Sequence, residues 1–540
     1  QDMRSRGVRR IKDVIRLRAR QFAEDGGPLA HAVRPDAYAR IDNLYTATVY
    51  EKGSEIIRML RQLIGEQAFW SGLDRYFQKH DGDAATIEDF IVCFEPFTDA
   101  DLAAFSHWYA QAGTPSVEAE TSFDSATGAA TLRLKQTTRP TPGQPDKRAL
   151  PIPLRVALFD DNGAKLTTAH NQQQADEHTI VLHKPEAEFV FENVGSTPLI
   201  SLNRGFSAPI RLNDGLDEPS RCRLAGADDD AFTSWNGLQQ VARNIMIDAA
   251  RSQEGVDPQR AATWATAVRQ AVESAVAQDT ELAALLLHIP TVSDLTQEIT
   301  PADPDLIHRQ RLDLRRTLAK ELEPLLTDHA SHPSEGPDAM SADAVGRRAM
   351  KSMALSLLST LGAAHEQLIL GAFNEARTMT ESLAGLSALS GIDSPAFDEA
   401  LARFEAKWRS MPLIMDKWYS VQASSPRADI RKRLETLRGR SDFDMKNPNR
   451  VRALAAAFGM NNTVAFNASD GWGYDFLASI IREVDGLNPA LSARLATAFE
   501  SWRGLTADRQ EKAQATLKAL AASSLSQNAA DIVGRALAQD

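Results

Sequence analysis

The spacing of apolar residues changes twice along this chain, and the two changes restrict the folds that it can adopt. Between residues 9 and 111 apolar side chains recur at helical spacing. At Gly113-Thr114-Pro115 the pattern becomes one of short alternating or continuous apolar runs, which is typical of strands. After Ala208-Pro209 it is helical again. Because 540 residues exceed one ordinary core, we expect a multidomain α+β protein whose β part lies between two helical parts.

These changes predict three domains: a helical one at residues 1–112, a small antiparallel β-sandwich at 113–213, and an all-α one at 214–540. The last contains too many helical segments for one bundle and shows no fixed repeat, which favours an irregular superhelical, solenoid-like array. A stretch rich in Pro, His and Gly at 329–338 predicts a surface loop there. In the sandwich we expect strands at residues 117–120, 130–136, 152–159, 179–182, 188–194 and 199–203.

The composition excludes several classes of protein. Hydrophobic residues make up 43% and charged residues 24%, as in a globular protein, and no apolar run approaches the roughly 20 residues of a membrane span. A net charge of −12 disfavours nucleic acid or an anionic membrane as a partner. Cys93 and Cys222 cannot form a disulfide framework, and no secretion signal is recognisable. We therefore expect a cytoplasmic protein that acts as a monomer.

One tyrosine, Tyr50, precedes a strongly amphipathic helical segment that contains Ile56, Ile57 and Leu60. A tyrosine hydroxyl is a neutral hydrogen-bond donor on a rigid ring, so it can stabilise a developing oxyanion. The pattern by itself favours another interpretation, in which the ring simply packs against the apolar helix and its hydroxyl is satisfied locally. A chemical role for Tyr50 therefore depends on the residues around it.

Several uncommon sequence motifs occur in one order along the whole chain, and together they resemble the M1 family of zinc aminopeptidases, of the bacterial alanyl aminopeptidase (aminopeptidase N) type. The segment around Tyr50-Glu51-Lys52-Gly53 is similar to the catalytic-tyrosine segment of that family. Further motifs that carry the resemblance are Pro28-Leu29-Ala30-His31, His80-Asp81-Gly82, Gly113-Thr114-Pro115, Met415-Asp416-Lys417-Trp418, Asn447-Pro448-Asn449-Arg450 and Asp470-Gly471-Trp472-Gly473-Tyr474.

The resemblance implies a fold and a set of site residues. The fold is the helical tail of a thermolysin-like catalytic domain, followed by the β-sandwich and the superhelical domain. Tyr50 is implied to stabilise the oxyanion, while Tyr45 and Glu51 line the pocket for the first side chain of the substrate. Arg452 and Arg494 are implied to face the channel that receives the rest of the peptide, where a guanidinium can hold a carbonyl or carboxylate. Most helix arginines are merely solvated, and His31, beside the active site in the family, serves packing equally well.

The sequence contains no zinc motif of the family, which is His-Glu-x-x-His followed by a distant Glu. His365-Glu366 is the one His-Glu pair, and Ile369 stands where the second histidine is required. His329 and His332 have a spacing that could contact a metal, but a solvated loop is the stronger interpretation. We therefore predict no metal ligands in this chain, and zinc in the parent enzyme would be bound upstream of Gln1.

We accordingly expect a C-terminal portion of a zinc aminopeptidase that removes N-terminal residues, Ala and basic ones among a broad range, from peptides. This portion would be inactive without the N-terminal half, which is its expected partner besides peptide substrates. Two alternatives remain open. One is a non-catalytic helical binding module with M1 architecture, although such a module has no reason to keep Tyr50. The other is a processed fragment that is active only after association with its N-terminal half.

Overall fold

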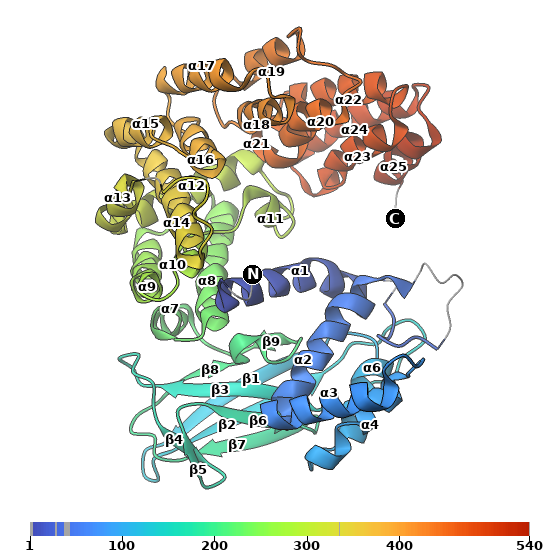
Figure 1. Cartoon of the computed structure of the whole chain (residues 1–540), viewed down its shortest axis with the longest axis vertical. Helices are drawn as coiled ribbons and strands as arrows, with labels where there is room; N and C mark the ends of the chain where they lie inside the picture. The colour runs from blue at the N-terminus through green and yellow to red at the C-terminus, as the bar shows by residue number, and fades with distance from the viewer. Residues whose placement is uncertain (1–3, 28–29, 37–43, 334, 539–540) are drawn as a thin grey trace. The chain divides into compact units, whose positions relative to one another are not determined.

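The computed structural model describes residues 4–27, 30–36, 44–333 and 335–538, and it divides into two compact units, Gln1–Leu238 and Gln239–Asp540 (Figure 1). The first unit contains helices and strands, and the second is helical. The order of helix, sandwich and helix confirms the predicted multidomain α+β class.

The first unit begins with helices α1 (Arg6–Asp25), η2 (Thr48–Lys52), α2 (Gly53–Ile64) and α3 (Glu66–His80). Ser5 caps α1 by accepting a hydrogen bond from the Val8 N–H at 3.0 Å. Gly65, with φ of 84°, separates α2 from α3 in a conformation that favours glycine. The shorter helices that follow are α4 (Ile87–Val92), η3 (Glu95–Phe97), α5 (Leu102–Phe105) and α6 (His107–Ala110).

The strands of the first unit form two main sheets and a hairpin. One sheet has the order β7-β2-β1-β9, the other the order β6-β3-β8, and β4 pairs with β5. All six predicted strands are present, and β4, β5 and β9 were not predicted. The unpredicted strand β9 pairs with β1 in parallel, whereas the other strand pairs are antiparallel as predicted. Each missed strand spans three residues, too few for alternation to show. The bounds are β1 Ser116–Asp124, β2 Ala129–Thr137, β3 Ile152–Phe159, β4 Thr168–His170, β5 Gln173–Ala175, β6 His178–Leu182, β7 Glu186–Phe191, β8 Leu199–Leu202 and β9 Arg211–Asn213.

One large apolar cluster joins the helices from α2 to α6 to the sandwich of the first unit. Ile56, Met59 and Leu60 of α2 belong to the same buried cluster as Leu132, Leu154 and Leu158 of the strands. Trp108 of α6 is fully buried and donates its indole N–H to the Pro151 carbonyl at 2.8 Å. The position of α2, and of the η2 turn that leads into it, is therefore fixed by packing against the sandwich.

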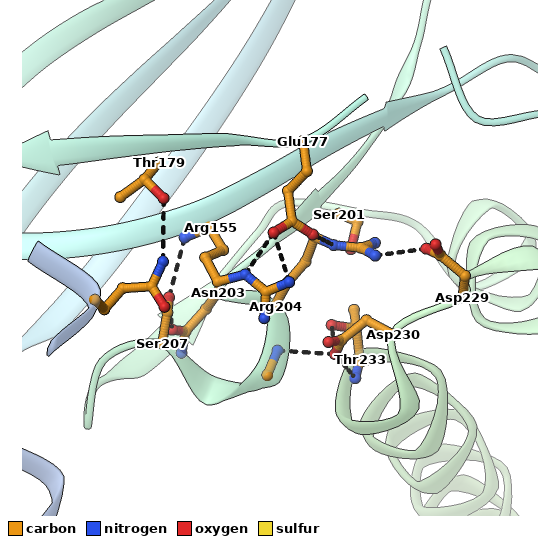
Figure 2. Close-up of polar contacts among 12 residues, drawn as sticks. Arg155, Glu177, Thr179, Ser201, Asn203, Arg204, Ser207, Asp229, Asp230 and Thr233 are labelled. Carbon is orange, nitrogen blue, oxygen red and sulfur yellow. Dashed lines mark hydrogen bonds and ion pairs between the residues drawn. The ribbon is translucent and has the colours of Figure 1, made fainter. Parts of the chain in front are cut away.

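A buried ion cluster connects the sandwich to the helices that follow it (Figure 2). Arg204 lies in the short helix η4 (Arg204–Phe206), directly after β8, and its side chain is 2% exposed. Its guanidinium donates to the carboxylates of Glu177, Asp228 and Asp229. Asp228 and Asp229 lie between α7 (Glu218–Ala227) and α8 (Ala231–Ser252). The cluster therefore ties the end of the sandwich to the start of the helical region.

The second unit is all-α, as predicted. Several of its helices begin with Asp or Asn at the N-cap followed by Pro at the first helical position, which satisfies the free N–H groups and pre-sets φ. One segment, η6 (Arg452–Asn461), is a π-helix. The α-helices that follow α8 are α9 Pro258–Val276, α10 Thr280–Leu286, α11 Val292–Thr296, α12 Pro304–Glu321, α13 Glu323–Ser331, α14 Ala342–Leu358, α15 Glu366–Asn374, α16 Met379–Leu389, α17 Ala396–Trp408, α18 Pro412–Ala423, α19 Ile430–Arg438, α20 Pro448–Val451, α21 Thr463–Phe466, α22 Trp472–Asp485, α23 Pro489–Ala496, α24 Ala507–Ala521 and α25 Gln527–Leu537.

Two local features of this unit concern the sequence predictions. The predicted loop at 329–338 begins later, because α13 continues to Ser331. In the described chain, Ala342–Asn374 is the one helical stretch with the length and mean hydropathy, 1.2, of a membrane span. It is not one straight helix, since Gly362 has φ of 76° and ψ of −142° between α14 and α15. Met350, Ala354 and Leu358 are also buried, as in a core helix.

Candidate functional site

Tyr50 lies on a π-helical turn and its side chain is largely exposed. The turn η2 leads without a break into α2, and Tyr50 is 59% exposed while Tyr45 is 67% exposed. Their rings stack with centroids 6.2 Å apart and an interplanar angle of 21°. The structure therefore brings these two predicted site residues together. The packing interpretation of Tyr50 does not describe this surface, because most of the Tyr50 side chain faces away from the core.

The backbone of the Tyr50 turn is held by its neighbours. The Tyr50 N–H donates to the Thr46 carbonyl at 3.2 Å, and the Thr46 hydroxyl accepts from the Val49 N–H at 3.2 Å. On the side of α1, Glu24 accepts a hydrogen bond from the Ala47 N–H at 3.2 Å. π-Helical turns are rare and are often found at functional sites. An exposed aromatic donor on a firmly bonded turn can keep its hydroxyl at a fixed place.

His31 contributes to the same support. Its Nε2 lies 2.9 Å from Glu24 Oε1, and its Nδ1 lies 2.7 Å from the Ala32 carbonyl oxygen. Glu24 thus links His31 to the turn that carries Tyr50. The structure favours the packing interpretation of His31, because both of its ring nitrogens have protein partners.

Glu51 lies near a basic residue of α1. Its carboxylate lies 4.0 Å from the guanidinium of Arg16 on α1, at the outer limit of an ion pair. A role for Glu51 in a substrate pocket beside Tyr50 stays a prediction.

Arg452 lines a cavity in the second unit. It begins the π-helix η6 and donates to Asn449 Oδ1 at 3.2 Å. The cavity has a volume of about 620 Å³ and lies between η6, α16 and α18. Its charged lining residues are Asp416, Lys417 and Arg452, and Asp416 already pairs with the buried Arg450 at 2.7 Å. The site therefore combines cationic groups with apolar walls, which suits part of a peptide.

Arg494 does not belong to that cavity. It lies exposed near the C-terminal end of α23 and is not among the residues that line the cavity. The structure thus supports a binding role for Arg452 more than for Arg494, and both assignments stay predictions.

The described residues do not fit the zinc site that the M1 resemblance implies. His365 Nε2 lies 3.0 Å from Glu323 Oε1, and the apolar Ile369 that follows it by one turn is fully buried. Within the described ranges, the one cluster with metal-ligand spacing is Asp328, His329 and His332. These residues follow one another on a single helix end and include no Glu that could act as a base. Among the described residues, neither His365 nor this cluster provides the ligand set of that zinc site.

Three sequence profiles match consecutive parts of the chain. The peptidase family M1 domain matches residues 5–109, a domain of unknown function with an Ig-like fold (DUF3458) matches 113–215, and a domain of unknown function with ARM repeats (DUF3458_C) matches 219–538.

Known proteins match nearly the whole chain. Aminopeptidase N of Caulobacter vibrioides is 41% identical, over 99% of this chain and 61% of that protein. Aminopeptidase N of Escherichia coli is 37% identical, over 96% of this chain and 60% of that protein. The crystal structure of Legionella pneumophila aminopeptidase A in complex with aspartic acid superposes with a TM-score of 0.71 at 26% identity, covering 98% of this chain and 62% of that one. The chain thus spans about three fifths of the length of these relatives.

Proposed function

The chain belongs to the M1 peptidase family, with the DUF3458 and DUF3458_C domains after its peptidase segment, and on that premise we propose that it is part of a zinc-dependent aminopeptidase. The enzyme would remove N-terminal residues, Ala and basic ones among a broad range, from peptides. The observation that carries this proposal is the exposed side chain of Tyr50 on a hydrogen-bonded π-helical turn, inside the segment that matches the peptidase domain.

Tyr50 would act on the reacting carbonyl. When a nucleophile adds to the first peptide carbonyl, the carbonyl oxygen becomes an oxyanion, which a preorganised donor stabilises more than it stabilises the substrate. The Tyr50 hydroxyl would donate to this oxygen. The rigid ring and the bonded turn lower the cost of aiming the donor. Tyr45, stacked on Tyr50, would line the pocket for the first side chain.

The second unit would bind the rest of the peptide. The cavity at η6 offers Arg452 and Lys417 as cationic groups beside apolar walls. A guanidinium can hold a peptide carbonyl or a carboxylate with paired hydrogen bonds. We assign the zinc ligands and the general base to protein sequence outside these 540 residues, because the His-Glu-x-x-His motif does not occur in them. On this proposal the chain alone neither binds catalytic zinc nor hydrolyses peptides.

The test measures release of alanine from an alanyl anilide. The chain is assayed alone and joined to the part of Caulobacter vibrioides aminopeptidase N that it does not match. We expect activity only in the joined protein, and a fall in kcat of about 10²–10³ in Tyr50→Phe, as is typical for the loss of one oxyanion donor. Tyr45→Phe, which keeps the ring stack, is the matched control and should change kcat far less. Zinc-dependent activity of the chain alone, or full activity of Tyr50→Phe, would contradict the proposal.

A further inference from the structure

We propose that α1 and the η2 turn are joined by a polar ladder of two rungs, Gln21–Thr48 and Asp25–Lys52, whose role is to position Tyr50. The inference rests on the proposed function of Tyr50 as an oxyanion donor. It assigns positioning roles to four buried residues, none of which is placed to contact substrate.

The two rungs follow from the spacing of the residues. Gln21 and Asp25 are four residues apart on α1, and Thr48 and Lys52 are four residues apart on η2, so each pair shares one face of its helix. Gln21 Nε2 donates to Thr48 Oγ1 at 3.4 Å, and Lys52 Nζ donates to Asp25 Oδ2 at 3.1 Å. The side chains of Lys52 and Asp25 are each 1% exposed. The ladder is therefore a contact inside the protein.

Tyr50 lies midway between the two rungs on the opposite side of the turn. Residues two apart on a helix point in nearly opposite directions, so burying Thr48 and Lys52 against α1 turns Tyr50 outward. The observed exposure follows this alternation, because Thr48 is fully buried, Lys52 is 1% exposed and Tyr50 is 59% exposed. Any rotation of the turn that moves the Tyr50 hydroxyl must also stretch or break the rungs.

The Asp25–Lys52 rung also forms hydrogen bonds with residues at the start of the sandwich. Lys52 Nζ donates to the Gly113 carbonyl at 2.9 Å, and the Thr114 hydroxyl donates to Asp25 Oδ2 at 2.8 Å. Lys52 therefore connects the turn to two other segments at once. If the Tyr50 turn were held on α1 by apolar packing alone, the turn could shift along the helix. The hydrogen bonds of Lys52 and Asp25 form in one position of the turn only.

The composition of the ladder suits positioning better than stability. Burial lowers the pKa of Lys52, which means that the site disfavours its charged form, although Asp25 partly compensates. Among the described residues, Asp25 Oδ1 and Gln21 Oε1 are buried without a hydrogen-bond partner. Apolar side chains of similar volume would stabilise such a site at least as well. Polar pairs instead raise the free energy of every other position of the turn on α1, because a shifted turn leaves the charges of Lys52 and Asp25 unpaired.

The first test measures hydrogen exchange in this chain with two ladder variants. Thr48→Val keeps the side-chain volume and leaves no buried charge unpaired, so it is expected to fold, and Lys52→Met breaks the charged rung. Both should speed exchange of the amides at 47–53 by about tenfold or more if local opening becomes easier. The matched control is Glu55→Gln, which weakens the neighbouring buried pair of Glu55 with Arg10. Unchanged exchange at 47–53 in both ladder variants would overturn the inference.

The second test is a double-mutant cycle in the joined protein with measurable activity. Thr48→Val should lower kcat about tenfold with little change in KM when Tyr50 is present, because a small misplacement of a catalytic group is costly. In the Tyr50→Phe background the same substitution should have almost no further effect, since residues that act as a unit are not additive. Equal losses in both backgrounds would overturn the positioning role. If Tyr50→Phe itself leaves kcat unchanged, the proposed function fails, and the ladder as a brace of the turn is then decided by hydrogen exchange alone.

Discussion

Two of the buried ion networks in the described part of the first unit, those of Arg204 and of Lys52, are built very differently. Arg204 is surrounded by acceptors: its guanidinium bonds to Glu177, Asp228 and Asp229, and also to the Ser201 hydroxyl at 3.2 Å. The Lys52–Asp25 pair has fewer partners, and one oxygen of Asp25 has none among the described residues. In the Arg204 network the guanidinium and Asp228 are buried while Asp229 is 60% exposed, whereas the buried Lys52–Asp25 pair lies directly behind an exposed tyrosine.

This contrast shows that the burial of a charge alone does not indicate the role of that charge. Arg204 donates to three carboxylates, so its removal leaves several acceptors unpaired and lowers stability, although burial also disfavours the charged form of Asp228. A pair with an unsatisfied oxygen contributes less to stability, so its presence needs another reason. Position relative to Tyr50 supplies that reason for Lys52. The comparison therefore predicts that damage to the Arg204 network lowers stability, while damage to the ladder lowers activity.

The largest expected effect on stability is that of Arg204→Met. Removing this guanidinium leaves Asp228 buried beside other carboxylates, and breaking a buried pair in this way typically costs about 3–5 kcal/mol. The loss should appear as a lower denaturant midpoint and as faster hydrogen exchange in β3 and β8. Activity per folded molecule of the joined protein should remain.

The control for Arg204→Met is Arg133→Met, which removes an exposed ion pair with Glu188 on neighbouring strands. Exposed pairs of this kind contribute little, so its midpoint should stay unchanged. If Arg204→Met lowered kcat without lowering the midpoint, the two networks would not differ as the comparison requires.

A pH dependence of stability is the second way to test the Arg204 network. Burial, more than any neighbouring charge, raises the pKa of Asp228 to about 6. In the unfolded chain its pKa is near the usual value of about 3.9. Between these two pKa values the folded chain keeps a proton on Asp228 that the unfolded chain has lost. The stabilisation that this proton gives is therefore complete below about pH 4 and is lost as the pH rises through about 6.

Asp228→Asn should remove that slope, because an amide does not titrate. The measurement compares the unfolding free energy of the parent chain and the variant between pH 4 and 7 by denaturant titration. The difference between the two unfolding free energies should change from pH 4 to about 6 and become constant above that pH. Parallel curves for the two proteins would show that Asp228 keeps an ordinary pKa in the folded chain.

Much of the fold, and less of the site, could be predicted from the sequence. The strand at Ile152–Phe159 was predicted with its full extent because its run of apolar residues is interrupted only by Arg155 and is followed by turn residues. Tyr50 was singled out by the motif around it. The π-helical form of its turn was not predicted, since the apolar spacing around Ile56 and Leu60 describes an α-helix equally well. The partners of Lys52 could not be predicted either, because Asp25 and Gly113 meet it only through tertiary packing.

The smallest expected effect is that of Gln21→Leu, which removes the weaker rung. Its single hydrogen bond to Thr48 is long, 3.4 Å, and its carbonyl oxygen is buried without a partner among the described residues. A leucine of similar volume removes that unsatisfied oxygen, so the loss of one neutral hydrogen bond, about 1 kcal/mol, should be largely offset in the unfolding free energy. The Thr48 hydroxyl loses its partner on α1, however, so exchange of the amides at 47–53 should still become faster. A variant that is as stable as the parent chain but has a looser Tyr50 turn would separate positioning from stability most clearly. If the protection of the turn against exchange and the unfolding free energy instead fell in proportion, this rung would be ordinary packing, and the contrast with the Arg204 network would then depend on Lys52 alone.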